Sequence, residues 1–381
     1  MMRPMKLAGE QLMFGQGCLA HLKTLTGQRA FIVSSRSALE KSGVIAKITG
    51  YLDECGIGHQ VYTSVEPDPH FATVYAGAEQ MKQYEPDWII AVGGGSAMDA
   101  AKAMWIFYEH PELTTLEQIT PPNGIPKLRG KARLICIPST SGSASEVSRS
   151  IVITDDKTGF KHGIGNMELM PDIALCDPEV TATMPKSLTA HTGMDALTHA
   201  LEAYVSQRAN YLSDILAAAA ACDIIQYVKK AYDDGDDMEA REYMLNASMT
   251  AGLAFTNVSL GIVHSMAHTL GSYFKIPHGL GNAVILPYVI AFNSRTAYAK
   301  VKYDALARTL GAASMEQAVR SLNEGLGIPS CFKEMIDRDQ YEALVEAMVT
   351  MAITDGCTKT NPVIPTREEQ AELFRQIYNG V

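Results

Sequence analysis

The chain has 381 residues and a formal net charge of −10, with 47% hydrophobic and 19% charged residues. This composition is typical of a globular protein rather than a disordered one, and the length predicts two domains of ordinary size. An acidic chain without a Lys/Arg-rich run is a poor candidate for binding nucleic acid or an anionic membrane surface.

The sequence also lacks the signals of membrane insertion or export. We find no apolar run of about 18 residues and no continuous apolar stretch near the start, so neither a membrane span nor a secretory signal is expected. The seven cysteines are scattered, odd in number and form no C-x-x-C pair. They indicate reduced thiols and favour a cytoplasmic location.

The first half of the chain alternates short apolar strands with helical patterns. Helices are expected around 37–55, 71–84 and 97–109, and strands at 29–34, 59–64, 87–93, 132–138, 150–154 and 172–177. Alternation with short connections indicates parallel strands joined by crossover helices. We therefore predict an α/β domain over 1–185 with a doubly wound, mainly parallel sheet.

The pattern becomes helical almost throughout after Pro185. Glycines and prolines separate the segments, as helix ends require. The expected helices cover 187–206, 211–233, 237–255, 258–271, 279–293, 297–310, 313–324, 339–352 and 366–378. This region predicts a second, all-helical domain over 186–381.

A glycine-rich turn, Gly93–Ser96, lies where the third apolar strand meets a helix. Glycines there let backbone N–H groups approach a phosphate, and the helix N-terminus adds partial positive charge. The turn is not the G-x-G-x-x-G fingerprint, because Met98 occupies the last glycine position, and it does not follow the first strand. Such turns are often purely structural, so this motif alone leaves phosphate binding and a structural turn as alternatives.

A second loop, 138–146, follows the fourth strand and is dense in serine and threonine. It is typical of a loop that grips a ribose or pyrophosphate, although a Ser-rich turn that caps a helix is a common alternative. Two such loops at the ends of neighbouring parallel strands strengthen the case, because ligands bind at that edge of open sheets.

The helical region contains a candidate metal site. Asp195 and His199 are four residues apart, as are His264 and His268, and His278 follows next to a proline. On a helix, side chains four apart project from one face. A single histidine here is more often a hydrogen-bonded core residue, but the whole set reverses those odds, because buried imidazoles and a carboxylate among apolar side chains need partners or a cation.

Three neutral imidazoles and one carboxylate can hold a divalent transition metal and leave a position open for substrate. The spacing does not say which three histidines bind.

Six stretches in order along the chain resemble the iron-containing (group III) alcohol dehydrogenases. The likeness is strongest to the alcohol dehydrogenase domain of bifunctional aldehyde–alcohol dehydrogenases and to butanol, propanediol and lactaldehyde reductases. The stretches are GGGSAMDAAK (93–102), IPSTSGSASEV (137–147), DPEVTATMP (177–185), GMDALTHALEAY (193–204), GIVHSMAH (261–268) and PHGLGNAVILP (277–287).

This resemblance implies roles for individual residues. The metal ligands it implies are Asp195, His199, His264 and His278, and His268 is left as a candidate catalytic proton-relay group. Gly94, Gly95 and Ser96 would hold the pyrophosphate of the cofactor. The remaining cofactor-contacting positions it implies are Ser35, Asp68, Ser139, Thr140, Ser148 and Lys161.

One departure from the family bears on the cofactor. Family members that prefer NAD often carry an acidic residue after the first strand, where this chain has Ser35 followed by Arg36. Without the carboxylate, repulsion of a 2′-phosphate disappears, and Arg36 can pair with that phosphate. The resemblance therefore predicts NAD(P)H as cofactor, with NADPH accepted. Ser139 and Ser148 replace the usual threonines and keep a hydroxyl.

The resemblance implies reversible hydride transfer between a nicotinamide cofactor and a small primary alcohol or aldehyde. Fe²⁺ is the first expectation for the metal, and the ligand set also suits Zn²⁺. The alternatives are a glycerol-type polyol dehydrogenase, a dehydroquinate-synthase-like lyase, and a non-catalytic metal-binding or scaffold protein with this fold. A homo-oligomer, a dimer or larger, is also expected from the family.

Overall fold

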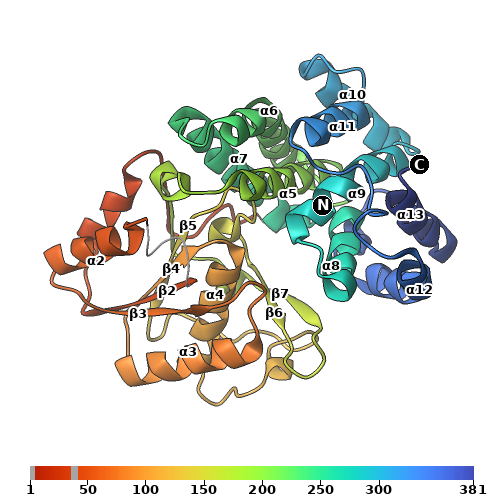
Figure 1. Cartoon of the computed structure of the whole chain (residues 1–381). Helices are drawn as coiled ribbons and strands as arrows, with labels where there is room; N and C mark the ends of the chain where they lie inside the picture. The colour runs from red at the N-terminus through yellow and green to blue at the C-terminus, as the bar shows by residue number, and fades with distance from the viewer. Residues whose placement is uncertain (1–4, 36–41) are drawn as a thin grey trace. The chain divides into compact units, whose positions relative to one another are not determined.

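The computed structural model describes residues 5–35 and 42–381. Its internal contacts divide the chain into two compact units, Met1–Met184 and Pro185–Val381. The first carries the strands and the second consists of helices (Figure 1).

The sheet of the first unit has six strands in the order β1-β8-β5-β4-β2-β3, and every neighbouring pair is parallel. The prediction of a mainly parallel sheet is therefore confirmed. The edge strand β1 was not expected, because its four residues carry no clear alternation. The strands are β1 (Gln11–Phe14), β2 (Arg29–Ser35), β3 (Gly58–Val65), β4 (Trp88–Gly93), β5 (Arg133–Pro138) and β8 (Ile173–Cys176).

Helices cover both faces of this sheet, as alternation along the strands requires. Phe31 and Val33 of β2 pack with the buried side chains of α3 and α4. Ala30 and Ile32 point the other way and pack with α2 and the 3₁₀ segment η1. The bounds are η1 (Cys18–Thr24), α2 (Val44–Glu54), α3 (Phe71–Tyr84) and α4 (Gly95–Glu109).

The strand expected at 150–154 is present but does not join the sheet. It is β6 (Ser150–Thr154), which pairs antiparallel with β7 (Lys161–Gly165), a strand the sequence did not indicate. The connection between them is too short for a parallel crossover, so only a hairpin can form. Short 3₁₀ segments complete the unit: η2 (Leu116–Gln118), η3 (Ser145–Val147), η4 (Met167–Leu169) and η5 (Pro178–Thr181).

The second unit is helical, as predicted, around one large apolar core. Several of its helices begin at a residue whose side chain accepts a backbone N–H, which supplies the partner that the first turn lacks: Asn210, Asp237, Thr296, Ser314, Asp337 and Thr366. The helices are α5 (Lys186–Val205), α6 (Tyr211–Asp233), α7 (Met238–Val258), α8 (Ile262–Phe274), α9 (His278–Asn293), α10 (Ala297–Thr309), α11 (Met315–Gly325), α12 (Arg338–Thr354), η6 (Thr358–Thr360) and α13 (Arg367–Asn379).

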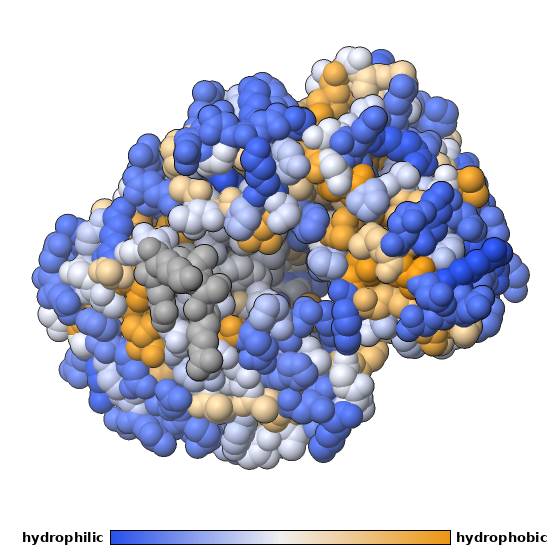
Figure 2. Space-filling view, viewed as in Figure 1, coloured by the Kyte–Doolittle hydropathy of each residue, from blue (hydrophilic) through white to orange (hydrophobic). Residues whose placement is uncertain are grey.

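Among the described residues, α6 alone is long and apolar enough to cross a membrane, by length and composition only. Its apolarity comes largely from a run of alanines that packs against α5 and α7, including the buried Ala217, Ala220 and Ala221. A core helix satisfies the same criterion. In the view of Figure 2, the surface of each unit is mostly hydrophilic, with apolar side chains in scattered patches.

Candidate functional site

Helix α5 carries two of the predicted metal ligands on one buried face. Asp195 and His199 are one helical turn apart, and the Nε2 atom of His199 lies 3.9 Å from the Oδ1 atom of Asp195. Both side chains are less than a tenth exposed. Met194, Ala196 and Leu197, on the other faces of the helix, are buried as well. The spacing in the sequence therefore does place the carboxylate and the imidazole together.

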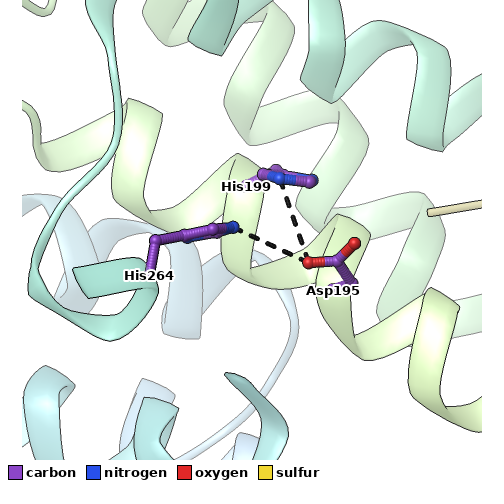
Figure 3. A group of neighbouring side chains, drawn as sticks. All are labelled: Asp195, His199 and His264. Carbon is purple, nitrogen blue, oxygen red and sulfur yellow. Dashed lines mark ion pairs between the residues drawn. The ribbon is translucent and has the colours of Figure 1, made fainter. Parts of the chain in front are cut away.

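His264 and His278 reach the same carboxylate from two other helices. The Nε2 atom of His264, on α8, lies 3.6 Å from Oδ1 of Asp195. The Nε2 atom of His278, the first residue of α9, lies 3.5 Å from that oxygen. Ligand atoms of Asp195, His199 and His264 all fall within 4.8 Å of one another, and Figure 3 shows both imidazoles paired with the Asp195 carboxylate.

The electrostatics of this cluster favour an ionised carboxylate. Burial alone would raise the pKa of Asp195, but His199, His278 and His264 together lower it well below its ordinary value. Burial also lowers the pKa of His278, to about 3, so its ring is neutral and able to bind a metal. One carboxylate and three imidazoles are a donor set that Fe²⁺ and Zn²⁺ both accept.

Glu202 supports His264 and was not identified from the sequence. Burial would lower the pKa of His264, but Glu202, helped by Asp195, raises it to about 9. The Nδ1 atom of His264 lies 2.6 Å from Oε2 of Glu202, and Oε1 accepts the backbone N–H of Val263 at 2.7 Å. A carboxylate on Nδ1 fixes the ring and leaves Nε2 directed at the cluster. Glu202 lies three residues after His199 on α5, and this spacing could have identified it in the sequence as a neighbour of the metal ligands.

Asn282 is a second residue that sequence reasoning missed. Its Nδ2 atom donates to Oδ1 of Asp195 at 2.7 Å and lies 3.1 Å from Nε2 of His278. Its Oδ1 atom is buried and has no hydrogen-bond partner among the described residues. A buried amide oxygen without a partner beside four candidate ligands is consistent with a site built for a polar or cationic group.

His268 takes a different position from the four clustered side chains. Its Nδ1 atom lies 2.8 Å from Oδ2 of Asp355, the residue that follows α12, and its ring stacks on that of His278. Burial would raise the pKa of Asp355, but the hydrogen bond with His268 and that from the Cys357 backbone N–H lower it to about 2. With Nδ1 directed at an ionised carboxylate, Nε2 of His268 is the nitrogen left for other partners.

The glycine turn of the first unit lies at the topological switch point of the sheet. The chain moves outward from β2 to β3, and β4 is added on the other side of β2. Ligands bind outside the carboxyl ends of the strands at such a point. This topology explains why the turn follows the third predicted strand and not the first.

Gly94 and Gly95 let this turn contact the hydroxyl-rich loop. A Cβ atom on Gly94 would lie 3.4 Å from the Thr140 side chain, and one on Gly95 would lie 3.0 Å from Cβ of Ser143. The backbone N–H of Ser139 donates to the Gly93 carbonyl at 2.9 Å. The two predicted cofactor loops are therefore neighbours, with the N-terminus of α4 between them.

Three further predicted cofactor residues meet near the same turn. The Ser96 hydroxyl lies 3.2 Å from the backbone nitrogen of Asp68, and the Asp68 carboxylate pairs with Nζ of Lys161 at 2.7 Å. Asp68 has a φ of 54°, a left-handed conformation that is uncommon outside glycine. Segments that are far apart in sequence thus bring Asp68, Ser96 and Lys161 together.

Ser148 and Ser35, the remaining predicted cofactor residues, lie at the end of the hydroxyl-rich loop and at the end of β2. Ser148 is buried, and its hydroxyl accepts the backbone N–H of Ser150 at 3.3 Å. Ser35 ends β2, and the register of Ser34 with Val92 sets that end beside the end of β4. Arg36, the residue expected to pair with a 2′-phosphate, lies outside the described residues.

The fold and these clusters define a protein of two units: a doubly wound parallel sheet of the kind that binds dinucleotides, and a helical unit with a candidate metal centre. A family model described as "Iron-containing alcohol dehydrogenase" matches residues 9–178, and one described as "Fe-containing alcohol dehydrogenase family, C-terminal" matches residues 189–378. The chain therefore belongs to the iron-containing alcohol dehydrogenase family. It is a metal-dependent oxidoreductase that uses a nicotinamide cofactor, and the polyol dehydrogenase and lyase alternatives are not favoured.

Individual relatives agree with this assignment. The chain is 46% identical to an NADPH-dependent butanol dehydrogenase of Clostridium saccharobutylicum, with 96% of each chain covered. It is 38% identical to the bifunctional aldehyde-alcohol dehydrogenase AdhE of Escherichia coli K12, covering 93% of this chain and 43% of the relative. The solved iron-containing alcohol dehydrogenase of Thermococcus thioreducens superposes with a TM-score of 0.93 at 33% identity, covering 99% of this chain and 100% of that chain.

Proposed function

We propose that this enzyme is an NADPH-linked, iron-dependent dehydrogenase that interconverts small primary alcohols and aldehydes, with butanol and butanal as representative substrates. The observation that carries the proposal is the convergence of Asp195, His199, His264 and His278, whose candidate ligand atoms meet around one carboxylate oxygen. The 46% identity to a chain named as an NADPH-dependent butanol dehydrogenase supports the choice of substrate and cofactor.

Those four side chains would hold the cation, with Fe²⁺ expected first and Zn²⁺ as the other suitable ion. The chemistry that the bound cation and nicotinamide supply is polarisation of a substrate oxygen and exchange of a hydride. Asp195 provides negative charge at the centre of the site, and Glu202 holds His264 with its Nε2 directed at the cluster. Phe255 stacks on the His199 ring and gives the cluster an apolar neighbour on that side.

His268 is assigned the proton transfer. Its Nδ1 is occupied by Asp355, so Nε2 is the nitrogen that can give a proton to the developing alkoxide during reduction and take it back during oxidation. Asp355 orients the ring through that contact. Replacing only His268 is therefore expected to retain the metal and slow turnover.

The dinucleotide is assigned to the turn and loops of the first unit. Backbone N–H groups of Gly94, Gly95 and Ser96 would bind the pyrophosphate at the N-terminus of α4. Polar side chains would contact the rest of the cofactor: Ser35, Asp68, Ser139, Thr140, Ser148 and Lys161. Ser35 has no charge to repel a 2′-phosphate, which is why NADPH is proposed as the preferred form.

The test is a substrate and cofactor panel on iron-reconstituted, anaerobic protein. C2–C6 aldehydes and diols are assayed with NADPH and with NADH, and kcat/KM is compared. The proposal expects the highest kcat/KM with NADPH and a C3–C5 aldehyde. A strong preference for NADH would reject the cofactor assignment, and a protein that turns over none of the panel would reject the substrate class.

We further propose a cytoplasmic location and a homo-oligomer, a dimer or larger. The seven cysteines all lie in the described part of the chain and form no disulfide there, which suits a reducing compartment. Light scattering coupled to size-exclusion chromatography measures the assembly directly, and a monomeric mass at micromolar concentration would contradict it.

A further inference from the structure

Helix α4 carries Asp99 and Lys102, and the function proposed above uses neither charge. Lys102 is fully buried, and its ammonium donates to the Ser145 carbonyl at 2.7 Å, the Ser145 hydroxyl at 2.9 Å and the Ser148 carbonyl at 2.9 Å. A lysine ammonium has three donors, so these contacts satisfy it completely. Lys102 therefore binds the hydroxyl-rich loop mainly through the backbone of that loop.

Asp99, one helical turn before Lys102, takes the complementary contacts. Its Oδ1 atom accepts the Ser145 hydroxyl proton at 2.7 Å, and its Oδ2 atom accepts the backbone N–H of Val152 at 2.9 Å. The Ser145 hydroxyl thus links the two charges, accepting from Lys102 and donating to Asp99. We call Asp99, Lys102 and Ser145 the α4 clamp.

The clamp connects segments that carry most of the candidate cofactor residues. Helix α4 begins at Gly95, directly after the glycine turn. The loop it holds contains Thr140 and Ser148, and Val152 lies on β6, which pairs with the β7 strand that carries Lys161. One pair of side chains on one helix therefore fixes the turn, the loop and the hairpin relative to one another.

Packing alone does not require charges at these positions. Removing a lysine ammonium and a carboxylate from water is unfavourable, and apolar side chains of similar volume stabilise an interior at least as well. Their contacts go to backbone carbonyls and an N–H in specific places, which is how a loop conformation is selected rather than a core filled. The arrangement thus fits a role in setting the geometry of the binding loop.

We infer that Asp99, Lys102 and Ser145 are positioning residues for dinucleotide binding: they hold the 139–148 loop and the β6–β7 hairpin in the geometry that receives the cofactor. The inference rests on the proposed assignment of the cofactor to this unit. None of the three residues needs to touch the cofactor, so their substitution should weaken binding without removing a cofactor contact.

The experiment measures the Kd for NADPH by fluorescence titration of the metal-loaded enzyme, together with KM, kcat, metal content and Tm. Lys102→Met removes the donors at similar volume, and Ser145→Ala removes only the linking hydroxyl. Lys131→Met is the matched control, because Lys131 also donates to a backbone carbonyl, that of Tyr108. Lys131 precedes β5, whereas the 139–148 loop follows that strand, so the control lies at the end of β5 away from the loop.

We expect the Kd and KM for NADPH to rise about tenfold in Lys102→Met and about threefold in Ser145→Ala, since bonds to a charged donor are lost or weakened. The kcat at saturating NADPH should change by less than about twofold, because no group that takes part in the chemistry is altered. Metal content should match the wild type, and Lys131→Met should bind NADPH normally.

Two results separate the inference from the proposed function. If wild-type protein binds neither NADPH nor NADH, the proposed function is wrong and the inference falls with it. If wild-type protein binds but Ser145→Ala and Lys102→Met keep the wild-type Kd, only the inference is overturned. Should Lys102→Met fail to fold, Ser145→Ala, which keeps both charges and the carbonyl bonds, decides the question.

Discussion

The two units hold their candidate sites by different means. In the second unit the chemistry lies on side chains of α5, α8 and α9, such as Asp195 and His264, whose rigid helices fix the distances. In the first unit it lies on a backbone turn, Gly94–Ser96, and on loops held by hydrogen bonds. A side-chain site fails when one donor is removed, whereas a backbone site fails when its shape changes. This difference predicts which substitutions each unit tolerates.

The strongest test of the side-chain site is His264→Ala. It removes a central donor and leaves Glu202 buried without its imidazole partner. We expect loss of bound metal and a fall in kcat of about a thousandfold or more, as for removal of an essential catalytic group. Elemental analysis and steady-state kinetics measure both. His191→Ala, on the same helical unit but outside the cluster, should retain metal; full turnover by His264→Ala would refute the site assignment.

The stability of the first unit should also depend on pH through Glu146. Burial raises the pKa of this carboxyl from 4.5 to about 7, against a smaller opposing effect of its hydrogen bonding and of Lys102. Because the folded state holds this proton more tightly than the unfolded chain does, protonation of Glu146 favours folding. This contribution is fully present below pH 4.5 and is lost as the pH rises through 7. Relative to Glu146→Gln, wild-type protein should lose roughly 3 kcal/mol of unfolding free energy over this range.

Denaturant unfolding of both proteins at pH 5 and pH 8 measures that difference. The comparison uses the change between the two pH values, so any constant effect of the amide cancels. Parallel behaviour of wild type and Glu146→Gln would show that Glu146 is ionised in the fold at both pH values or exposed to solvent.

Glu202→Gln distinguishes a ligand from the residue that orients it. The amide keeps the size of the side chain, but its single oxygen cannot accept from both His264 and the Val263 N–H, and the negative charge is lost. Metal affinity should fall about 10-fold to 100-fold, as for other carboxylates that support metal-binding histidines. Competition with a chromophoric chelator gives the Kd, and an unchanged Kd would show that the Glu202 charge does not tune the metal.

Gly95→Ala tests the backbone site with the smallest change. The added Cβ would lie 3.0 Å from Cβ of Ser143, so the hydroxyl-rich loop must shift. We expect the KM for NADPH to rise about tenfold at unchanged metal content, because a small displacement in a binding site has large effects. Gly50→Ala is the matched control: it lies within α2, and nothing lies within 4 Å of its new Cβ atom. An unaltered KM in Gly95→Ala would separate the turn from cofactor binding.

Local pattern was sufficient for most elements. The helical periodicity predicted the same bounds for α3 and α6 as the structure shows, and the apolar runs predicted the ends of the central strands to within one residue. These elements have continuous hydrophobic faces, which a local pattern can detect. The short edge strand β1 and the hairpin strand β7 were missed, since Lys161–Gly165 has little apolar pattern and is ordered by its partner β6. Pairing of this kind depends on contacts that no local window contains.

The sequence by itself determined which donor atoms are available and that Asp195 lies beside His199. Residues four apart on a helix are neighbours whatever surrounds the helix. Spacing left open which histidines converge, and the family resemblance named His264 and His278. The tertiary structure supplies the geometry, directing those two to one carboxylate and His268 to Asp355. It also supplied Glu202, Asn282 and the α4 clamp. The physical reason is that helical geometry is local, whereas the packing angles that bring α5, α8 and α9 together arise from the whole core.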